Sequence, residues 1–386
     1  MKFANRTDWA LAPNQLSLIL QELQSRGIPV LDLTISNPTV CGLGFPEDRI
    51  RAALRAAENG IYRPDPRGLL SAREAVCRYY ANLGIAVTPQ QIFLTSSTSE
   101  AYSFVFRLLA DPGDRVLFPK PSYPLFDFLS GINDVDLGYY PLTYHDRWQI
   151  DFAQLAANYA PDAKALVVVN PNNPTGNYVY ETELRQLNAF CKSCAIALIS
   201  DEVFFDYPLT DQRAGVSLAG NEECLTFVLS GISKILAMPQ MKLSWILVNG
   251  PQALVQEACA KLEVIADTYL SVGAPAQTAL PQWFSLQSEI QSVILNRIRA
   301  NFTRLREITA GSDIKLLNAQ GGWYAVLRLP YGTDEEARVL KLLKEQRVFV
   351  HPGYFFEMDA FPAIVVSLLV PEKELDSGMR KLLVLI

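Results

Sequence analysis

The chain has 386 residues, of which 49% are hydrophobic and 10% aromatic, so it is long enough to bury a large core and to form more than one lobe. Its net charge of −6 comes from 34 basic and 40 acidic residues that are interspersed along the chain, which excludes the basic stripe of a nucleic-acid-binding protein. No apolar run reaches the roughly 18 residues that a membrane span needs, because Lys234 interrupts the best candidate, so we expect no membrane partner.

The N-terminal segment lacks the continuous apolar core of an export signal. Six scattered cysteines are typical of reduced thiols in a chain of this size, so we expect a cytoplasmic protein. The one CxxC, from Cys191 to Cys194, has no second pair and only His145 and His351 as imidazole partners, which favours ordinary helix-face cysteines over a metal or redox site. An N-terminal helix is instead predicted by the spacing of Leu16, Ile19, Leu20 and Leu23.

Short β-rich runs alternate with helical patterns up to about residue 280. Buried strands separated by helices predict an α/β fold, in which helices cover both faces of a mostly parallel sheet and ligands bind outside the carboxyl ends of the strands. The runs are QIFLT (91–95), RVLFP (115–119), ALVVVN (165–170), AIALISD (195–201) and LTFVLS (225–230).

The pattern changes after residue 280. A long helix is predicted over 286–310, and a strand-like run over 321–330 precedes a helix over 334–346 and two more strand-like runs. Together with the N-terminal segment, this region is expected to form a smaller α+β domain. We therefore assign residues 45–280 to a large domain, and residues 1–44 and 281–386 to a small one.

The strand ends of the large domain carry functional groups. After the run 91–95, Ser96, Ser97 and Thr98 open an apolar helix, whose free N–H groups and hydroxyls could bind a phosphate. The alternative is a capping box between Ser97 and Glu100, which needs no ligand, and this turn alone favours that alternative.

The next strand ends supply a ring, an amide and a carboxylate. Tyr123, on a rigid turn beside two prolines, could stack on a planar ligand, although core packing is the commoner fate. Asn173, in PNNPTG, could aim its amide at a ligand oxygen or simply belong to a Pro/Gly turn. Asp201 ends a strongly apolar strand, where a carboxylate needs a cation or a hydrogen-bond donor.

Lys234 is the one charged residue in the mostly apolar stretch 224–241. Burial lowers the pKa of a lysine and makes its neutral amine a nucleophile. The alternative, which this segment favours about equally, is an ammonium group that reaches solvent or caps a helix. Taken together, the strand ends offer the groups that can hold pyridoxal phosphate: an imine to the lysine, a carboxylate for the pyridinium nitrogen, and a helix N-terminus for the phosphate.

A series of motifs makes nearly the whole sequence similar to the class I/II aminotransferases, fold-type I pyridoxal phosphate enzymes that resemble aspartate aminotransferase. The resemblance implies a three-layer α/β/α large domain with a mostly parallel seven-stranded sheet, a small domain from both chain termini, and a homodimer with shared active sites. The motifs are LTISNPT (33–39), YRPDPRG (62–68), TSSTSEAY (95–102), DPGDRVLFPKPSYPLF (111–126), NPNNPTG (170–176), SDEVF (200–204), SGISK (230–234) and HPGYFF (351–356).

The resemblance also implies a role for each site residue. Lys234 would be the Schiff-base lysine, which carries the proton between the substrate α-carbon and C4′ of the cofactor, and Asp201 would pair with the pyridine nitrogen. Asn173 would donate to the 3′-oxygen and Tyr123 would stack on the ring. The phosphate would be bound by Ser96, Ser97, Thr98, Lys242 and, from the neighbouring subunit, Tyr62.

Four positions depart from the family pattern. Lys242 stands where an arginine is usual, so a point charge replaces a bidentate fork. Phe204 replaces a tyrosine that bonds the 3′-oxygen, which should raise the pKa of the imine, and Ser97 replaces a glycine. Val365 stands where an arginine usually binds the substrate carboxylate, so either another cation serves or the amine carbon of the substrate bears no carboxylate. The cations considered, for each of which a structural role is favoured, are Arg63, Arg67, Arg328 and His351.

We therefore expect an aminotransferase that moves an amino group from an amino acid or amine to a keto acid or other carbonyl acceptor by a ping-pong mechanism. A pyridoxal-phosphate-dependent lyase or decarboxylase is the alternative, suggested by Val365 and Phe204. A regulatory module is disfavoured because too few residues precede Leu33 for a helix-turn-helix domain, and a nicotinamide dehydrogenase is disfavoured because the first strand-to-helix turn lacks GxGxxG.

Overall fold

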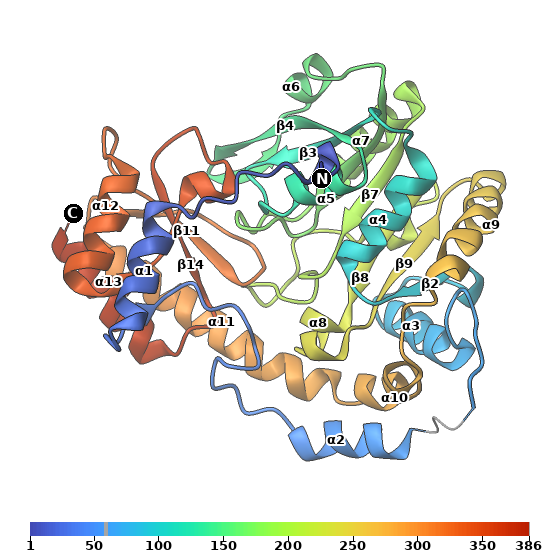
Figure 1. Ribbon diagram of the computed structural model, residues 1–386, viewed down its shortest axis with the longest axis horizontal. Coiled ribbons are helices and arrows are strands. Elements are labelled where there is room, and N and C mark those ends of the chain that lie inside the picture. The colour runs from blue at the N-terminus through green and yellow to red at the C-terminus, as the bar shows by residue number, and fades with distance from the viewer. Residues whose placement is uncertain (58–60, 386) are drawn as a thin grey trace.

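The computed structural model describes residues 1–57 and 61–385, and its larger part is built on one eight-stranded sheet (Figure 1). The strand order is β2-β9-β8-β7-β6-β3-β4-β5. The strands are β2 (Ile92–Thr95), β3 (Arg115–Lys120), β4 (Asp136–His145), β5 (Arg147–Ile150), β6 (Ala163–Val169), β7 (Ala197–Asp201), β8 (Thr226–Gly231) and β9 (Ser244–Asn249).

The sheet is mostly parallel, as predicted. β8, β7, β6, β3 and β4 run parallel to one another, whereas β9 is antiparallel to both β2 and β8. The sheet has eight strands rather than the seven expected, because β5 folds back against β4 after Asp146, which adopts a left-handed φ of 60°. The parallel order places the carboxyl ends of β3, β6, β7 and β8 along one edge.

Helices cover both faces of this sheet and give the predicted three layers (Figure 1). Successive strand residues point to opposite faces, so Phe93 packs in one hydrophobic cluster and Leu94 in the other. One face is covered by α4 (Thr98–Leu109), α5 (Phe126–Ile132) and α9 (Gln252–Tyr269). The other is covered by α3 (Leu70–Asn82), α7 (Glu181–Cys194) and α10 (Ala274–Phe284).

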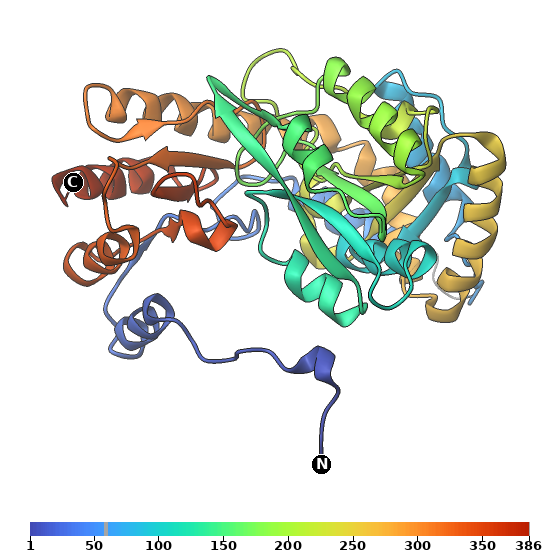
Figure 2. The same ribbon diagram turned by 90° about the horizontal axis from the view of Figure 1, so that it is seen from above.

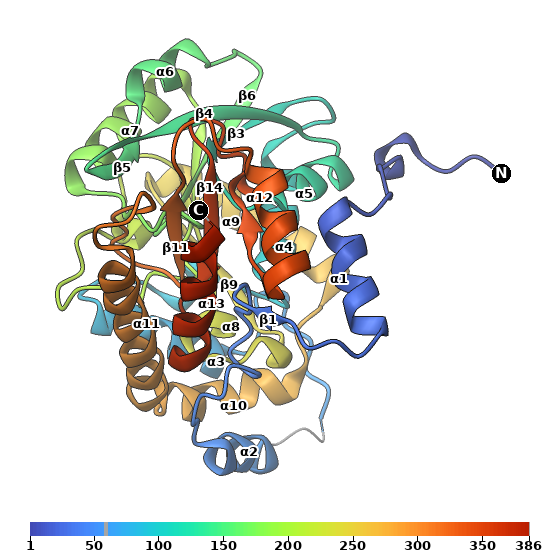
Figure 3. The same ribbon diagram turned by 90° about the vertical axis from the view of Figure 1, so that its left-hand side faces the viewer.

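The smaller part is a four-stranded antiparallel sheet in the order β10-β11-β14-β13. Figure 3 looks onto it, with α11, α13 and α12 around the sheet and α1 beside α12. Its elements are β10 (Lys315–Leu316), β11 (Tyr324–Arg328), β13 (His351–Pro352), β14 (Ala363–Ser367), α1 (Gln15–Ser25), α11 (Gln287–Thr309), α12 (Glu335–Lys341), which continues as a π-helical turn (Leu342–Gln346), and α13 (Glu372–Leu385).

Both chain termini contribute to this smaller part. β1 (Leu31–Asp32) pairs in parallel with β12 (Val348–Phe349), which joins the N-terminal segment to the C-terminal region. The domain boundaries at 44/45 and 280/281 stay predictions. α10 runs without a break through residue 280, and the Trp283 indole N–H donates to the carbonyl of Ile50 in α2 (Glu47–Ala56) at 3.1 Å.

The N-terminal segment leaves α1 and runs along the outside of the molecule to α5 (Figure 2). There Arg6 pairs with Asp134 at 2.6 Å, and the ring of Trp9 meets the edge of Phe128 with 5.8 Å between centroids. Within residues 1–57 and 61–385, no helix combines the length and apolarity needed to cross a membrane, and no cluster of three acidic, histidine or cysteine side chains is placed to hold a metal ion.

Candidate active site

A cavity of about 240 Å³ lies at the carboxyl ends of the parallel strands, which is where open α/β sheets bind ligands. Its wall combines the turns after β2 and β3, the ends of β6, β7 and β8, the start of β9, and β11 from the smaller part. Of the nine predicted site residues, the cavity is lined by Thr98, Tyr123, Asn173, Asp201 and Lys234.

Lys234 lies partly buried in α8 (Ile232–Ile235), the short helix after β8. Its Nζ is 5.0 Å from the ring centroid of Trp323 and 5.4 Å from that of Phe204, and it forms no ion pair with any described residue. Burial lowers the pKa of Lys234 to about 8, although Asp201 acts in the opposite direction. A substantial fraction of the amine is therefore neutral, and so nucleophilic, near neutral pH.

Asp201 is the last residue of β7 and is 9% exposed. One carboxylate oxygen accepts a hydrogen bond from the Tyr102 hydroxyl at 3.2 Å, and the other accepts from the N–H of Val203 at 3.2 Å. Burial raises the pKa of Asp201 to about 6, while these two bonds and Lys234 act to lower it. The group is ionised at neutral pH and keeps further acceptor capacity toward the cavity.

Asn173 and Tyr123 supply an unsatisfied amide and a ring. The Asn173 side chain is 8% exposed, and its Oδ1 has no hydrogen-bond partner among the described residues. A hydrogen-bond donor in the cavity would satisfy this oxygen, since a buried acceptor without a partner costs about 1–3 kcal/mol. Tyr123 is 44% exposed and lines the same cavity, so its ring is accessible to a planar ligand.

The start of α4 is both capped and free to bind an anion. The Ser97 hydroxyl accepts from the N–H of Glu100 at 3.1 Å, and the Glu100 carboxylate accepts from the N–H of Ser96 at 2.6 Å. The N–H groups of Thr98 and Ser99 have no partner among the described residues, and both residues line the cavity. Two free donors at a helix N-terminus suit a phosphate. Ser96 and Ser97 do not line the cavity.

Lys242 and Tyr62 lie outside the cavity of this subunit. Lys242 follows a 3₁₀ turn, with a left-handed φ of 51°, and is exposed two residues before Ser244, which does line the cavity. Tyr62 is 79% exposed in the loop that precedes α3. Their assignment to the phosphate therefore stays a prediction, which for Tyr62 requires a second subunit.

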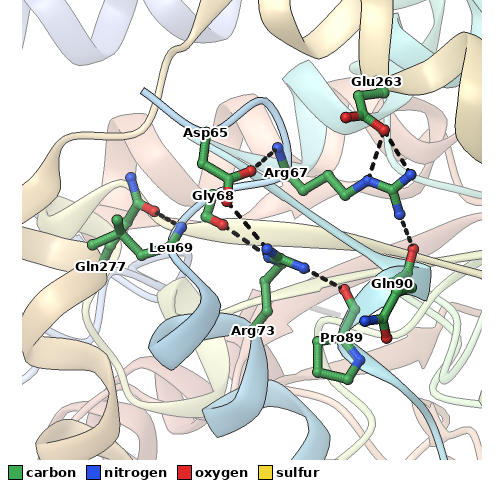
Figure 4. Close-up of polar contacts among 9 residues, drawn as sticks. All are labelled: Asp65, Arg67, Gly68, Leu69, Arg73, Pro89, Gln90, Glu263 and Gln277. Carbon is green, nitrogen blue, oxygen red and sulfur yellow. Dashed lines mark hydrogen bonds and ion pairs between the residues drawn. The ribbon is translucent and has the colours of Figure 1, made fainter. Parts of the chain in front are cut away.

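The loop that follows Tyr62 is anchored from several sides (Figure 4). The Arg73 guanidinium donates to the carbonyls of Gly68 and Pro89, each at 2.8 Å, and to the Asp65 carboxylate at 3.2 Å. Arg67 pairs with Glu263 of α9 at 2.6 Å. These bonds hold the loop in place, while the Tyr62 side chain stays exposed.

The four cations considered for a substrate carboxylate do not line the cavity. Arg67 is paired with Glu263, Arg328 lies over the ring of Phe361 at 5.6 Å, and Arg63 is exposed. Val365 is 1% exposed in β14, opposite His351 of β13, whose pKa is lowered by burial. Among the described residues that line the cavity, Lys234 is the only cation.

The structure adds residues that sequence reasoning missed. Ser99 and Tyr102 lie on the same helix as Thr98, and Ser233 precedes Lys234, so their positions beside predicted residues were available signals. Ser244 lies two residues after the predicted Lys242 and reaches the cavity through strand pairing, which the sequence does not display. From the smaller part, the Tyr324 hydroxyl donates to Ser36 at 2.8 Å, and both residues line the cavity.

Comparisons with known proteins agree with this geometry. A sequence profile described as aminotransferase class I and II matches residues 28–382. Alanine aminotransferase of Mycobacterium tuberculosis is 30% identical over 376 residues, covering 93% of this chain and 86% of that protein. Glutamate-pyruvate aminotransferase AlaA of Escherichia coli is 26% identical over 345 residues, covering 87% and 85%. A solved alanine aminotransferase from Pyrococcus furiosus has the same fold, with a TM-score of 0.89 at 23% identity over 98% of both chains.

Proposed function

The chain belongs to the class I and II aminotransferase family, and from this premise we propose how its own residues carry out the transfer. The enzymes of the family depend on pyridoxal phosphate, which when bound supplies an aldehyde for the amino group and a ring that withdraws electrons from the substrate α-carbon. The observation that carries the proposal is one cavity that holds the unpaired amine of Lys234 and the ionised carboxylate of Asp201.

We propose that Lys234 has two tasks. Its neutral amine would hold the cofactor covalently, and the amine freed by a donor would move a proton at the substrate α-carbon. Its pKa of about 8 suits both tasks, because general acid–base catalysis is most efficient near the working pH.

The remaining residues would hold the ring. Asp201 would keep the ring nitrogen protonated, and Tyr102 would orient that carboxylate through its 3.2 Å hydrogen bond. The Asn173 side chain would donate to the 3′-oxygen through its Nδ2 group, and Tyr123 would stack on the ring. Each of these groups has free capacity toward the cavity, which is what an occupant of this kind requires.

We propose that the phosphate lies at the start of α4, against the free N–H groups of Thr98 and Ser99. Lys242 would approach this end from outside the cavity wall, and Tyr62 of a second copy of the chain would reach it, which would make the enzyme a homodimer. The exposure of Tyr62 on an anchored loop supports that part of the proposal.

The six cysteines, all free thiols, support a cytoplasmic enzyme.

The names of the relatives suggest the substrates. We propose that alanine and glutamate are donors, with pyruvate among the acceptors, as the names of the M. tuberculosis and E. coli proteins indicate for those enzymes. Because the described cavity wall has no cation besides Lys234, the substrate carboxylate would be bound by hydroxyl and amide donors or by the partner subunit. The lyase or decarboxylase alternative is not favoured, because the family profile and the relatives that cover most of this chain are aminotransferases.

The absorption spectrum of the cofactor-loaded protein tests this function. A yellow band is expected with pyridoxal phosphate, and addition of alanine or glutamate should bleach it as pyridoxamine phosphate forms. Alanine and ethylamine form a matched pair that differs in the carboxylate alone. Bleaching by alanine but not ethylamine would support the amino acid donor, and the reverse would show a substrate without a carboxylate there. Release of ammonia without pyridoxamine phosphate would contradict amino transfer.

Tyr102→Phe is expected to weaken cofactor binding at the acidic end of the pH range. The Tyr102 hydroxyl is a donor that lowers the pKa of Asp201, so its loss should raise this pKa above its present value of about 6. One hydrogen bond to a charged group corresponds to a rise of about one pH unit. Below its pKa the carboxyl is neutral and no longer pairs with a protonated ring nitrogen. Cofactor affinity should therefore fall more at pH 6.5 than at pH 8.5.

Titration of the apoenzyme with pyridoxal phosphate across this pH range checks the expectation. Tyr140→Phe is a matched control, because Tyr140 is equally buried but donates to the carbonyl of Val167 and does not line the cavity. Parallel pH profiles for the wild type and Tyr102→Phe would show that the tyrosine does not act through Asp201.

A further inference from the structure

Ser244 lines the cavity at the start of β9. It begins β9, the strand between β2 and β8, and its partners in the sheet are Thr95 on one side and Gly231 on the other. Thr95 leads into the start of α4, and Gly231 leads into the helix that carries Lys234. Directly paired residues in neighbouring strands lie about 5 Å apart, so Ser244 lies between these two functional segments.

The lack of a side chain at Gly231 leaves space for the Ser244 hydroxyl. The φ of Gly231 is 177°, an extended conformation that any residue adopts, so its backbone does not require glycine. A Cβ at residue 231 would overlap Ser244 Oγ and lie 2.8 Å from Ser244 Cβ. The absence of a side chain at 231 is therefore explained by the space that the Ser244 side chain occupies.

The hydroxyl in this position has no partner within the protein. Ser244 is 1% exposed, and its Oγ makes no hydrogen bond to any described residue. It lines the cavity together with Thr98 and Ser99, whose N–H groups are also free. The hydroxyl therefore keeps its donor for a ligand in the cavity that accepts hydrogen bonds.

We propose that the Ser244 hydroxyl donates to the phosphate group of pyridoxal phosphate, and that Gly231 provides the space that this contact requires. The inference rests on the proposed placement of the phosphate at the start of α4. Within the cavity wall the dianion would meet neutral donors: two backbone N–H groups from α4 and one hydroxyl from β9, which lie at adjacent strand ends. The contact compensates for the small number of cations at this end of the cavity.

The first test compares pyridoxal phosphate with pyridoxal, which lacks the phosphate. Ser244→Ala should weaken pyridoxal phosphate about 10- to 100-fold, the range for one hydrogen bond to a charged group, and leave pyridoxal within about twofold. Affinities come from titrating the apoenzyme and following the visible band. An equal loss for both ligands would show a general structural effect, and no loss for either would show that Ser244 makes no contact; each result overturns the inference.

Ser230→Ala is the matched control. Ser230 precedes Gly231 in β8, is equally buried, and donates to the carbonyl of Glu202 at 3.4 Å, but it does not line the cavity. Both affinities should be unchanged in this variant. A phosphate-specific loss in Ser230→Ala would contradict the assignment to Ser244.

Two single substitutions test the role of Gly231. Gly231→Ser alone should weaken pyridoxal phosphate because its Cβ overlaps the Ser244 side chain, and Ser244→Gly alone should weaken it because the hydroxyl is lost. Wild-type affinity in Gly231→Ser would overturn the role given to Gly231.

The same titration in a Lys234→Ala background separates this inference from the proposed function. Without the lysine the cofactor is held by noncovalent contacts, and the Ser244→Ala loss should persist there. If the wild-type chain binds pyridoxal phosphate but Ser244→Ala does not alter the affinity, the inference alone fails. If the wild-type chain forms no complex at all, the proposed cofactor site fails with it.

Discussion

Lys234→Ala is expected to lower the rate of amino transfer by about 10³-fold or more, since it removes both the covalent bond to the cofactor and the group that moves the proton. Steady-state turnover with the donor identified by the bleaching experiment provides the measurement. An added small amine, such as methylamine, should restore part of the rate because it can carry the proton through the space that the side chain leaves.

Lys261→Ala serves as the control for loss of a lysine. Lys261 is an exposed residue of α9 that pairs with Glu257 of the same helix, and its replacement should leave turnover unchanged. Turnover by Lys234→Ala within about tenfold of the wild type, without an added amine, would refute the role proposed for this residue.

The loss in Lys234→Ala should not come from unfolding. The pKa of Lys234 is about 8 in the folded protein and 10.5 for an ordinary lysine, so between these values the unfolded chain binds the proton more strongly, and the stability of the folded state rises with pH. Below pH 8 the folded state therefore bears the cost of a partly buried ammonium group. At pH 7 the free energy of unfolding of the Lys234→Ala apoenzyme should equal or exceed that of the wild type, as a urea titration can show.

Asp201→Asn is expected to have the second largest effect, a loss of about 10²- to 10³-fold in turnover with weaker cofactor binding. The substitution keeps the shape of the side chain and an acceptor for the Tyr102 hydroxyl but removes the buried negative charge, and removing one member of a buried charge pair costs about 3–5 kcal/mol. The ring nitrogen would then lose its proton, and with it the electron-withdrawing power that the reaction needs.

A cofactor analogue makes this experiment specific. Pyridoxal phosphate methylated at the ring nitrogen carries a permanent positive charge, so it should restore turnover in Asp201→Asn by at least tenfold. Glu202→Gln is the matched control: this neighbouring carboxylate is 2% exposed, but it accepts from Ser217 and from the Leu218 N–H and does not line the cavity. Equal losses in the two variants, without rescue by the analogue, would show that Asp201 has a structural role.

Much of the fold follows from local patterns that the sequence displays. The apolar runs at 165–170 and 195–201 became β6 and β7, because a strand buried on both faces must be apolar along its whole length. The spacing of Leu16 and Leu23 likewise predicted α1. The extra strand β5 was missed, because RWQI is short and its pairing depends on the single-residue turn at Asp146.

The candidate site, like the fold, could be predicted from the sequence only in part. The sequence by itself determined that Asp201 and Lys234 follow buried strands, and parallel strands place such residues at one edge of a sheet. Only the tertiary structure decided what surrounds them: Tyr102 reaches Asp201 across 99 residues, and the pKa of Lys234 depends on desolvation by packed neighbours. Ser244 beside Gly231 depends on strand register, which couples residues without any regular spacing along the chain. Such contacts form between segments that are distant in the sequence, so a local sequence pattern cannot predict them.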